Sequence, residues 1–221
     1  MASGSSVQLL SLIVTQDKSK FVFKAAKKMD LSVTTLMGSG TVESSFLNML
    51  GITSSRREVL KILLKSSDAK KIMKAVDSKL QLGKPGHGIA YFTNVLACAG
   101  VRGIESIAPE NNIIAEENMY HKITAIVDRG NSEKVTDIAK NAGARGGTVL
   151  HGRGSAGKDA QTIFGVEIEP EKDLVIIITP SSITENVFNA IAKELDLESP
   201  GKGVIFVEPI VQTHGLFESQ E

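Results

Sequence analysis

Residues 200–207, which read PGKGVIFV, decide the fold, because the chain contains this pattern twice. Residues 85–92 read PGHGIAYF, so the same proline and glycine turn before an apolar run lies 115 residues earlier, counted from 85 to 200. A second pair agrees with the first, since residues 36–40 (LMGSG) match residues 150–154 (LHGRG) at a distance of 114. Two glycine motifs in the same order indicate a duplicated domain. Two copies of about a hundred residues predict a tandem of globular domains and not a solenoid.

The strands and helices expected from the sequence follow the same order in both copies. In the first copy, residues 8–15 are apolar and β-branched, and residues 22–29 carry apolar side chains at helical spacing. Residues 121–127 and 132–142 repeat this strand and this helix. A strand that ends in Gly-x-Gly, a third strand, a second helix and a last strand complete each copy. The order βαββαβ is typical of ferredoxin-like domains. We therefore predict an α+β fold of two tandem ferredoxin-like domains with antiparallel sheets.

The domain boundaries follow from the extent of the two copies. We place the first domain at residues 7–102 and the second at residues 119–217. Residues 103–118 lie between them, are rich in Glu and Asn, and contain Pro109, which favours a linker.

Composition and charge restrict the possible environments and partners. The 25 Lys and Arg residues balance 25 Asp and Glu residues, so the overall charge gives no argument for nucleic acid or an anionic membrane. No stretch reaches the roughly 20 apolar residues that span a bilayer, and the first residues lack the positive charge of a signal peptide. We expect a cytoplasmic protein with no nucleic-acid partner and no direct membrane insertion.

Residues 143–158 are the part of the chain best suited to an anion. Successive glycines after a strand let backbone N–H groups converge on an anion, and Arg153 and Lys158 can add charge-assisted hydrogen bonds to a phosphate. The alternative is a flexible basic loop that binds nothing. Residues 152–158 also fit the opening of a P-loop, but Asp159 stands where the magnesium-binding Ser or Thr belongs, and a strand pattern follows in place of a helix. We therefore expect no NTPase.

Three segments of the second copy resemble the PII nitrogen-regulatory signalling family. They are residues 147–154, the third strand ending at residues 179–180, and residues 200–209. The resemblance is close over residues 120–216 and looser over residues 7–101. It implies ferredoxin-like domains that form trimers and bind adenine nucleotides in clefts between subunits. It also implies that a loop after the second strand docks on a transporter or a metabolic enzyme.

The resemblance further implies an effector site built from two glycine motifs. Its residues would be Gly152, Arg153, Gly154, Ser155, Gly157, Lys158, Gly201, Lys202 and Gly203. Lys202 would replace the lysine that the family usually carries after the second glycine, where Val204 stands here. Weaker equivalents in the first copy would be Gly38, Ser39, Gly40, Gly86, His87 and Gly88. We expect the second copy to bind the effector better, because the Gly-x-Gly segment of the first has no basic neighbour.

We expect a nitrogen-regulatory protein without catalytic residues, cofactor or metal. Its effector would be AMP, ADP or ATP, with the roles of 2-oxoglutarate and magnesium left open. The resemblance favours a homo-oligomer, preferably a trimer.

Two alternatives stay open. Trimeric copper-tolerance proteins share this fold, so a metal site assembled across subunits is one alternative, although the spacing of His87, His121, His151 and His214 predicts none. A small nucleotide or phosphoester hydrolase would use Glu167 or Glu169 together with a metal.

Overall fold

The computed structural model describes residues 6–41, 54–84, 86–109, 120–155, 162–163, 166–167, 169–210 and 213. Contacts divide the chain into two compact units. Unit 1 consists of Met1–Thr93 and His151–Lys172, and unit 2 consists of Asn94–Leu150 and Asp173–Glu221. Strands β7 (Thr148–Ser155) and β10 (Glu171–Pro180) each contribute residues to both units.

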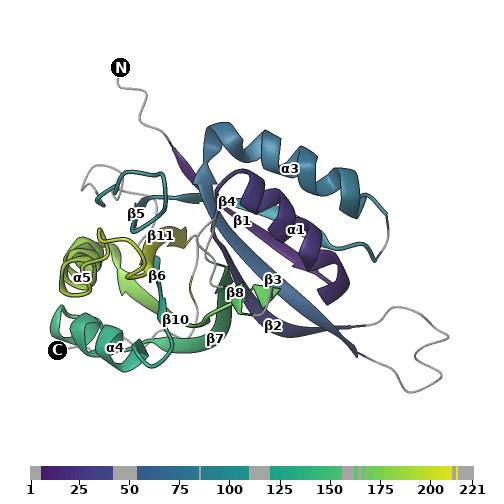
Figure 1. The fold of residues 1–221 in the computed structure, drawn as a ribbon. Coiled ribbons are helices and arrows are strands. Elements are labelled where there is room, and N and C mark those ends of the chain that lie inside the picture. Colours follow the sequence, from purple (N-terminus) through teal and green to yellow (C-terminus); the bar gives the residue numbers. More distant parts are fainter. Residues whose placement is uncertain are drawn as a thin grey trace. The chain divides into compact units, whose positions relative to one another are not determined.

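Unit 1 is a sheet with two helices on one face (Figure 1). Its elements are β1 (Val7–Val14), α1 (Gln16–Lys28), β2 (Val33–Thr41), β3 (Ser54–Lys65), α3 (Ser66–Leu80), most of β4 (Ile89–Val95), and the short strands β8 (Thr162–Ile163) and β9 (Val166–Glu167). The strand order is β4-β1-β3-β2, followed by the end of β7. Strand β3 pairs antiparallel with both β1 and β2.

The core of unit 1 lies between the sheet and the helices. Alternate residues of a strand share one face, and those of β1 and β3 that face the helices are fully buried. They are Leu10, Leu12, Leu60, Ile62 and Leu64. One stripe of each helix packs against them, namely Val22 and Ala26 of α1 and Ile72, Val76 and Leu80 of α3.

Unit 2 repeats this arrangement. Its elements are β5 (Ala97–Ala99), β6 (Tyr120–Asp128), α4 (Ser132–Asn141), the start of β7, most of β10, α5 (Ser181–Glu194) and β11 (Val204–Ile210). The strand order is β7-β10-β6-β11-β5, and β11 pairs antiparallel with both β6 and β5. In the core, strand residues such as Ile123, Ile177 and Ile205 again pack against the buried sides of the two helices, α4 and α5.

The strand order confirms the predicted fold class. In both copies the last strand lies beside the first, the first beside the third, and the third beside the second, as β4-β1-β3-β2 and β11-β6-β10-β7. Each copy is therefore an antiparallel βαββαβ domain of the ferredoxin-like kind.

The predicted domain boundaries stay a prediction, and the two compact units divide the chain at other places. Cys98 pairs with Phe206 of β11 and forms a bridge with Ile107, so residues 94–109 belong with unit 2. Residues 151–172 of the second copy belong with unit 1. Within the described ranges, no helix is long and apolar enough to cross a membrane.

Candidate functional site

The Gly-x-Gly motif of the second copy lies in a strand, where sequence reasoning expected a loop. Gly152 and Gly154 belong to β7 and pair with Leu36 and Thr34 of β2. A Cβ atom on Gly152 would come within 2.5 Å of the carbonyl oxygen of Thr35, so only glycine lets β2 approach this closely. The N–H of Gly154 donates to the carbonyl oxygen of Pro170 at 2.9 Å. These two glycines therefore support strand pairing.

Arg153, between the two glycines, is held by two carboxylates. Its Nη2 lies 3.2 Å from Oε1 of Glu58, and its Nη1 lies 3.5 Å from Oε2 of Glu169. The Glu58 side chain is only 3% exposed, whereas that of Arg153 is 38% exposed. A phosphate that binds Arg153 therefore has to join or displace a carboxylate. Glu169, at the more exposed end of the cluster, is the easier one to displace.

The register explains why Arg153 meets Glu58. Arg153 lies opposite Thr35, and Glu58 lies opposite Met37 two residues further along β2. Glu58 and Leu60 are two residues apart on β3, so they share the face of the sheet that packs against the helices. Directly opposite residues also share a face. Arg153, Thr35 and Met37 therefore lie on this face together with Glu58. Nη2 of Arg153 also lies 3.5 Å from the sulfur of Met37. Sequence reasoning missed Glu58, because it lies 95 residues from Arg153 and belongs to no motif.

The Pro-Gly-x-Gly motifs form equivalent turns in the two units. Gly201 and Gly203 have φ values of 81° and 137°, and Gly86 and Gly88 have φ values of 73° and 125°. A Cβ on Gly203 would lie 2.7 Å from the carbonyl oxygen of Ile126 in β6. The corresponding distance from Gly88 is 2.8 Å, to the carbonyl oxygen of Ile13 in β1. The repeated motif is therefore a repeated backbone geometry, which places the turn against the first strand of each copy.

The central residues of the two turns differ. Lys202 is exposed. His87 is half-buried, and its Nδ1 donates to the carbonyl oxygen of Leu80 at the end of α3, at 2.7 Å. The carbonyl oxygen of His87 accepts a hydrogen bond from Nζ of Lys18 at 3.2 Å. Lys202 is therefore available to an anion, whereas the His87 side chain is bound to the last turn of α3.

The predicted effector residues are distributed over both units. Gly152, Arg153, Gly154 and Ser155 belong to unit 1, and Gly201, Lys202 and Gly203 belong to unit 2. Gly157 and Lys158 lie outside the described residues. In the first copy, Gly38, Ser39 and Gly40 continue β2 and pair with β3, and Gly86, His87 and Gly88 form the turn before β4. The assignment of these residues to one effector site stays a prediction.

The histidines and acidic residues bear on the two alternative functions. His121 is buried, its Nδ1 lies 3.0 Å from Oγ1 of Thr184, and burial lowers its pKa, which favours the neutral ring. His151 is exposed, and His214 lies outside the described residues. No group of three or more His, Cys, Asp or Glu side chains that could hold a metal occurs in the described part of the chain. Glu169, one of the two carboxylates considered for hydrolysis, is paired with Arg153.

Comparison with known proteins gives one family match. Residues 120–216 match the family described as Nitrogen regulatory protein P-II, and this range includes both glycine motifs of the second copy. No curated protein matches the chain.

Two solved structures are similar to parts of the chain. The PII protein of Arabidopsis thaliana bound to citrate is 26% identical over 42% of this chain and 76% of its own, with a TM-score of 0.33. The GlnK–ATP complex of B. subtilis is 22% identical over 44% of this chain and 86% of its own, with a TM-score of 0.34.

Proposed function

We propose, on the premise that residues 120–216 belong to the nitrogen regulatory protein P-II family, that this chain is a cytoplasmic regulatory protein that senses an adenine nucleotide. Proteins of this family are signalling regulators and not enzymes. The observation that carries the proposal is that the family match includes both glycine motifs of the second copy. AMP, ADP and ATP are the proposed effectors.

The proposed binding residues are those that can contact a phosphate without disturbing the fold. Lys202 is exposed on a turn that two glycines keep close to β6. Arg153 supplies a second cation if the phosphate takes the place of Glu169, an exchange of one anion for another that leaves Glu58 paired. Lys158 is the third proposed cation. Charge-assisted hydrogen bonds of this kind are worth about 1.5–3 kcal/mol each.

The proposed regulation follows from this exchange. A nucleotide shifts the protein toward the conformation that it binds better. If phosphate displaces Glu169, this residue is released from Arg153. We propose that this release changes the affinity of residues 155–171 for a partner protein. We propose a transporter or a metabolic enzyme as the partner, and a homo-oligomer, preferably a trimer, as the functional assembly.

Isothermal titration of the purified chain with AMP, ADP and ATP tests the proposal, with and without magnesium and 2-oxoglutarate. We expect saturable binding at one site per chain. The Lys202→Ala variant should bind at least about tenfold more weakly, the factor that 1.4 kcal/mol represents. Lys84→Ala, beside the equivalent turn of the first copy, is the matched control and should bind like the parent. Absence of heat with all three nucleotides would overturn the proposal.

A further inference from the structure

The helices of unit 1 carry a charge that the helices of unit 2 lack. Helices α1 and α3 together contain nine lysines and three aspartates, a net charge of +6. Helices α4 and α5 occupy the same places in the second copy and contain three lysines and four acidic residues, a net charge of −1. The neutral total of the whole chain therefore conceals a local excess of positive charge.

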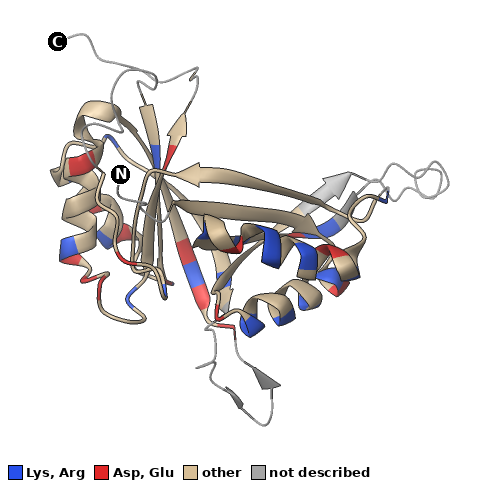
Figure 2. Ribbon diagram, turned by 90° about the horizontal axis from the view of Figure 1, so that it is seen from above, with Lys and Arg blue, Asp and Glu red and all other residues tan. Residues whose placement is uncertain are grey.

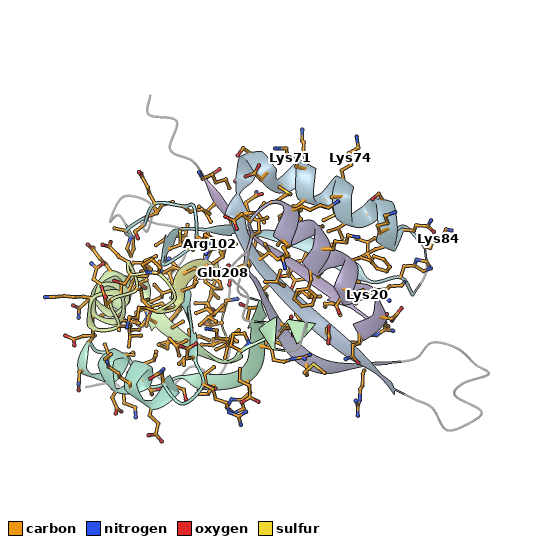
Figure 3. The ribbon with its side chains drawn as sticks, viewed as in Figure 1. Lys20, Lys71, Lys74, Lys84, Arg102 and Glu208 are labelled. Atoms are coloured by element: carbon orange, nitrogen blue, oxygen red, sulfur yellow. The ribbon has the colours of Figure 1, made fainter. Side chains whose placement is uncertain are left out.

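The lysines of α1 and α3 form one outward surface, which we call the basic helical face. The two helices pack side by side over the sheet of unit 1 (Figure 1). Figure 2 shows lysines distributed along both helices, and Figure 3 shows Lys71 and Lys74 projecting from α3 away from the sheet. The exposed lysines of this face are Lys20, Lys24, Lys27, Lys28, Lys70, Lys71, Lys74 and Lys79. Its exposed carboxylates are Asp17 and Asp77.

The fold does not require this charge. The second copy builds the same helical layer with balanced charges, so packing explains the buried stripes of α1 and α3 but not their lysines. Lysines at spacings of three or four, such as Lys20, Lys24 and Lys28 or Lys70 and Lys74, repel one another along a helix. A surface that keeps such repulsion is suited to a partner with dense negative charge.

One apolar side chain on the basic helical face indicates the kind of partner. Phe21 is 38% exposed, and it is the one exposed large hydrophobic residue that the described parts of α1 and α3 present. The Nζ atom of Lys20 lies 5.4 Å from the centre of its ring. Phenylalanine and lysine on one helical surface suit the boundary between lipid headgroups and acyl chains, which accepts both the ring and the ammonium groups.

The presence of lysine and not arginine on this face favours a lipid surface over a nucleic acid as the partner. The basic helical face contains lysines and no arginine. Arginine forms the paired hydrogen bonds that recognise phosphates and bases of nucleic acids, whereas lysine acts as a point charge toward a diffuse layer of anions. Two helices of 13 and 15 residues, about 20 Å long each, offer such point charges over a broad area.

We propose that the basic helical face binds reversibly to the surface of an anionic lipid bilayer, with Phe21 entering the headgroup region. Each lysine near the membrane surface should raise the binding constant about fivefold. The attraction weakens as salt shortens the range of the electrostatic interaction. This inference does not depend on nucleotide binding by the second copy.

Vesicle flotation with matched variants tests the proposal. The full chain should float with vesicles of phosphatidylcholine and phosphatidylglycerol at low salt, and should not float with phosphatidylcholine alone. Lys24→Gln, Lys70→Gln and Lys74→Gln combined should weaken binding by about a hundredfold. The control combines Lys134→Gln, Lys140→Gln and Lys193→Gln on α4 and α5 and should bind like the parent. Thermal unfolding by circular dichroism verifies that both triple variants are folded.

A fluorescent reporter tests the orientation of the bound protein. The chain contains no tryptophan, so Phe21→Trp introduces a single one. Its emission should shift to shorter wavelength with the anionic vesicles only. Absence of flotation, equal loss of binding in both triple variants, or flotation without an emission shift would each overturn the proposal. Tighter binding to a DNA duplex than to vesicles at the same salt would also overturn it, in favour of nucleic acid.

Discussion

Replacement of Arg153 by alanine removes the cation that Glu58 pairs with in the structure. The Glu58 side chain is 3% exposed, and Arg153 reaches it from β7 at 3.2 Å. The variant therefore leaves a buried carboxylate without this partner. The loss concerns stability and is separate from any role of Arg153 in binding phosphate.

The size of the effect follows from the burial of the two partners. Removal of one member of a fully buried ion pair costs about 3–5 kcal/mol, whereas exposed pairs contribute about 1 kcal/mol or less. Because Glu58 is buried and Arg153 is 38% exposed, we expect Arg153→Ala to lower the free energy of unfolding by about 2 kcal/mol. Glu58→Gln, which leaves a neutral amide, should cost about 1 kcal/mol.

A double-mutant cycle isolates the interaction between the two side chains. With both substitutions, the buried carboxylate at position 58 is gone, so the combined loss should be smaller than the sum of the single losses by about 1–2 kcal/mol. Urea unfolding followed by circular dichroism gives the four free energies. Arg56→Ala is the matched control, because Arg56 is an exposed arginine of β3 and its loss should cost less than about 0.5 kcal/mol. Additive losses, or equal losses for Arg153→Ala and Arg56→Ala, would refute the reasoning.

Three further predictions concern backbone, histidine and cysteine. Gly203→Ala and Gly88→Ala should each lower stability by more than about 2 kcal/mol in thermal unfolding, because the new Cβ would strike a carbonyl oxygen 2.7 or 2.8 Å away. Gly201→Ala, which meets no atom within 4 Å, should cost only about 1 kcal/mol for its positive φ. Burial lowers the pKa of His121 in the folded chain, so the unfolded chain takes up a proton first as the pH falls. The unfolding free energy should therefore decrease as the pH drops below about 6.5, and a His121→Gln variant, measured by urea unfolding, should lose that part of the slope. Burial also raises the pKa of the Cys98 thiol, so a disulfide reagent should react with it only after denaturant unfolds the chain; reaction in buffer at the rate of a free thiol would contradict this.

The fold could be predicted because its signals are local and repeated. Apolar residues 8–15 correspond to β1, and the helical stripe that includes Val22 and Ala26 is the buried side of α1. Glycine motifs at nearly equal spacing identified the second copy, and the φ values of the Pro-Gly-x-Gly glycines agree between the copies. Such patterns depend only on near neighbours in the chain, which a single sequence records.

The contacts of the site depend on residues far apart in the chain and could not be predicted. Gly152 and Gly154 have the composition of an anion-binding loop, but β2, more than a hundred residues earlier, pairs with them and extends the strand. Arg153 was expected to be available to phosphate, and no local pattern indicates Glu58 as its partner. The charge of α1 and α3 was hidden for a different reason, because a total over the whole chain averages a basic layer with acidic segments elsewhere.

The assignment of residues 151–172 to unit 1 has a consequence for how the protein can be divided. The chain passes between the units at three places, after Thr93, after Leu150 and after Lys172. A gene cut within residues 103–118 would separate unit 1 from the strand segment that pairs with β2, and would deprive unit 2 of β5. The two halves, made as separate polypeptides, should therefore be poorly folded alone and should recover structure when they are mixed. The two ferredoxin-like copies of this chain therefore depend on each other's residues.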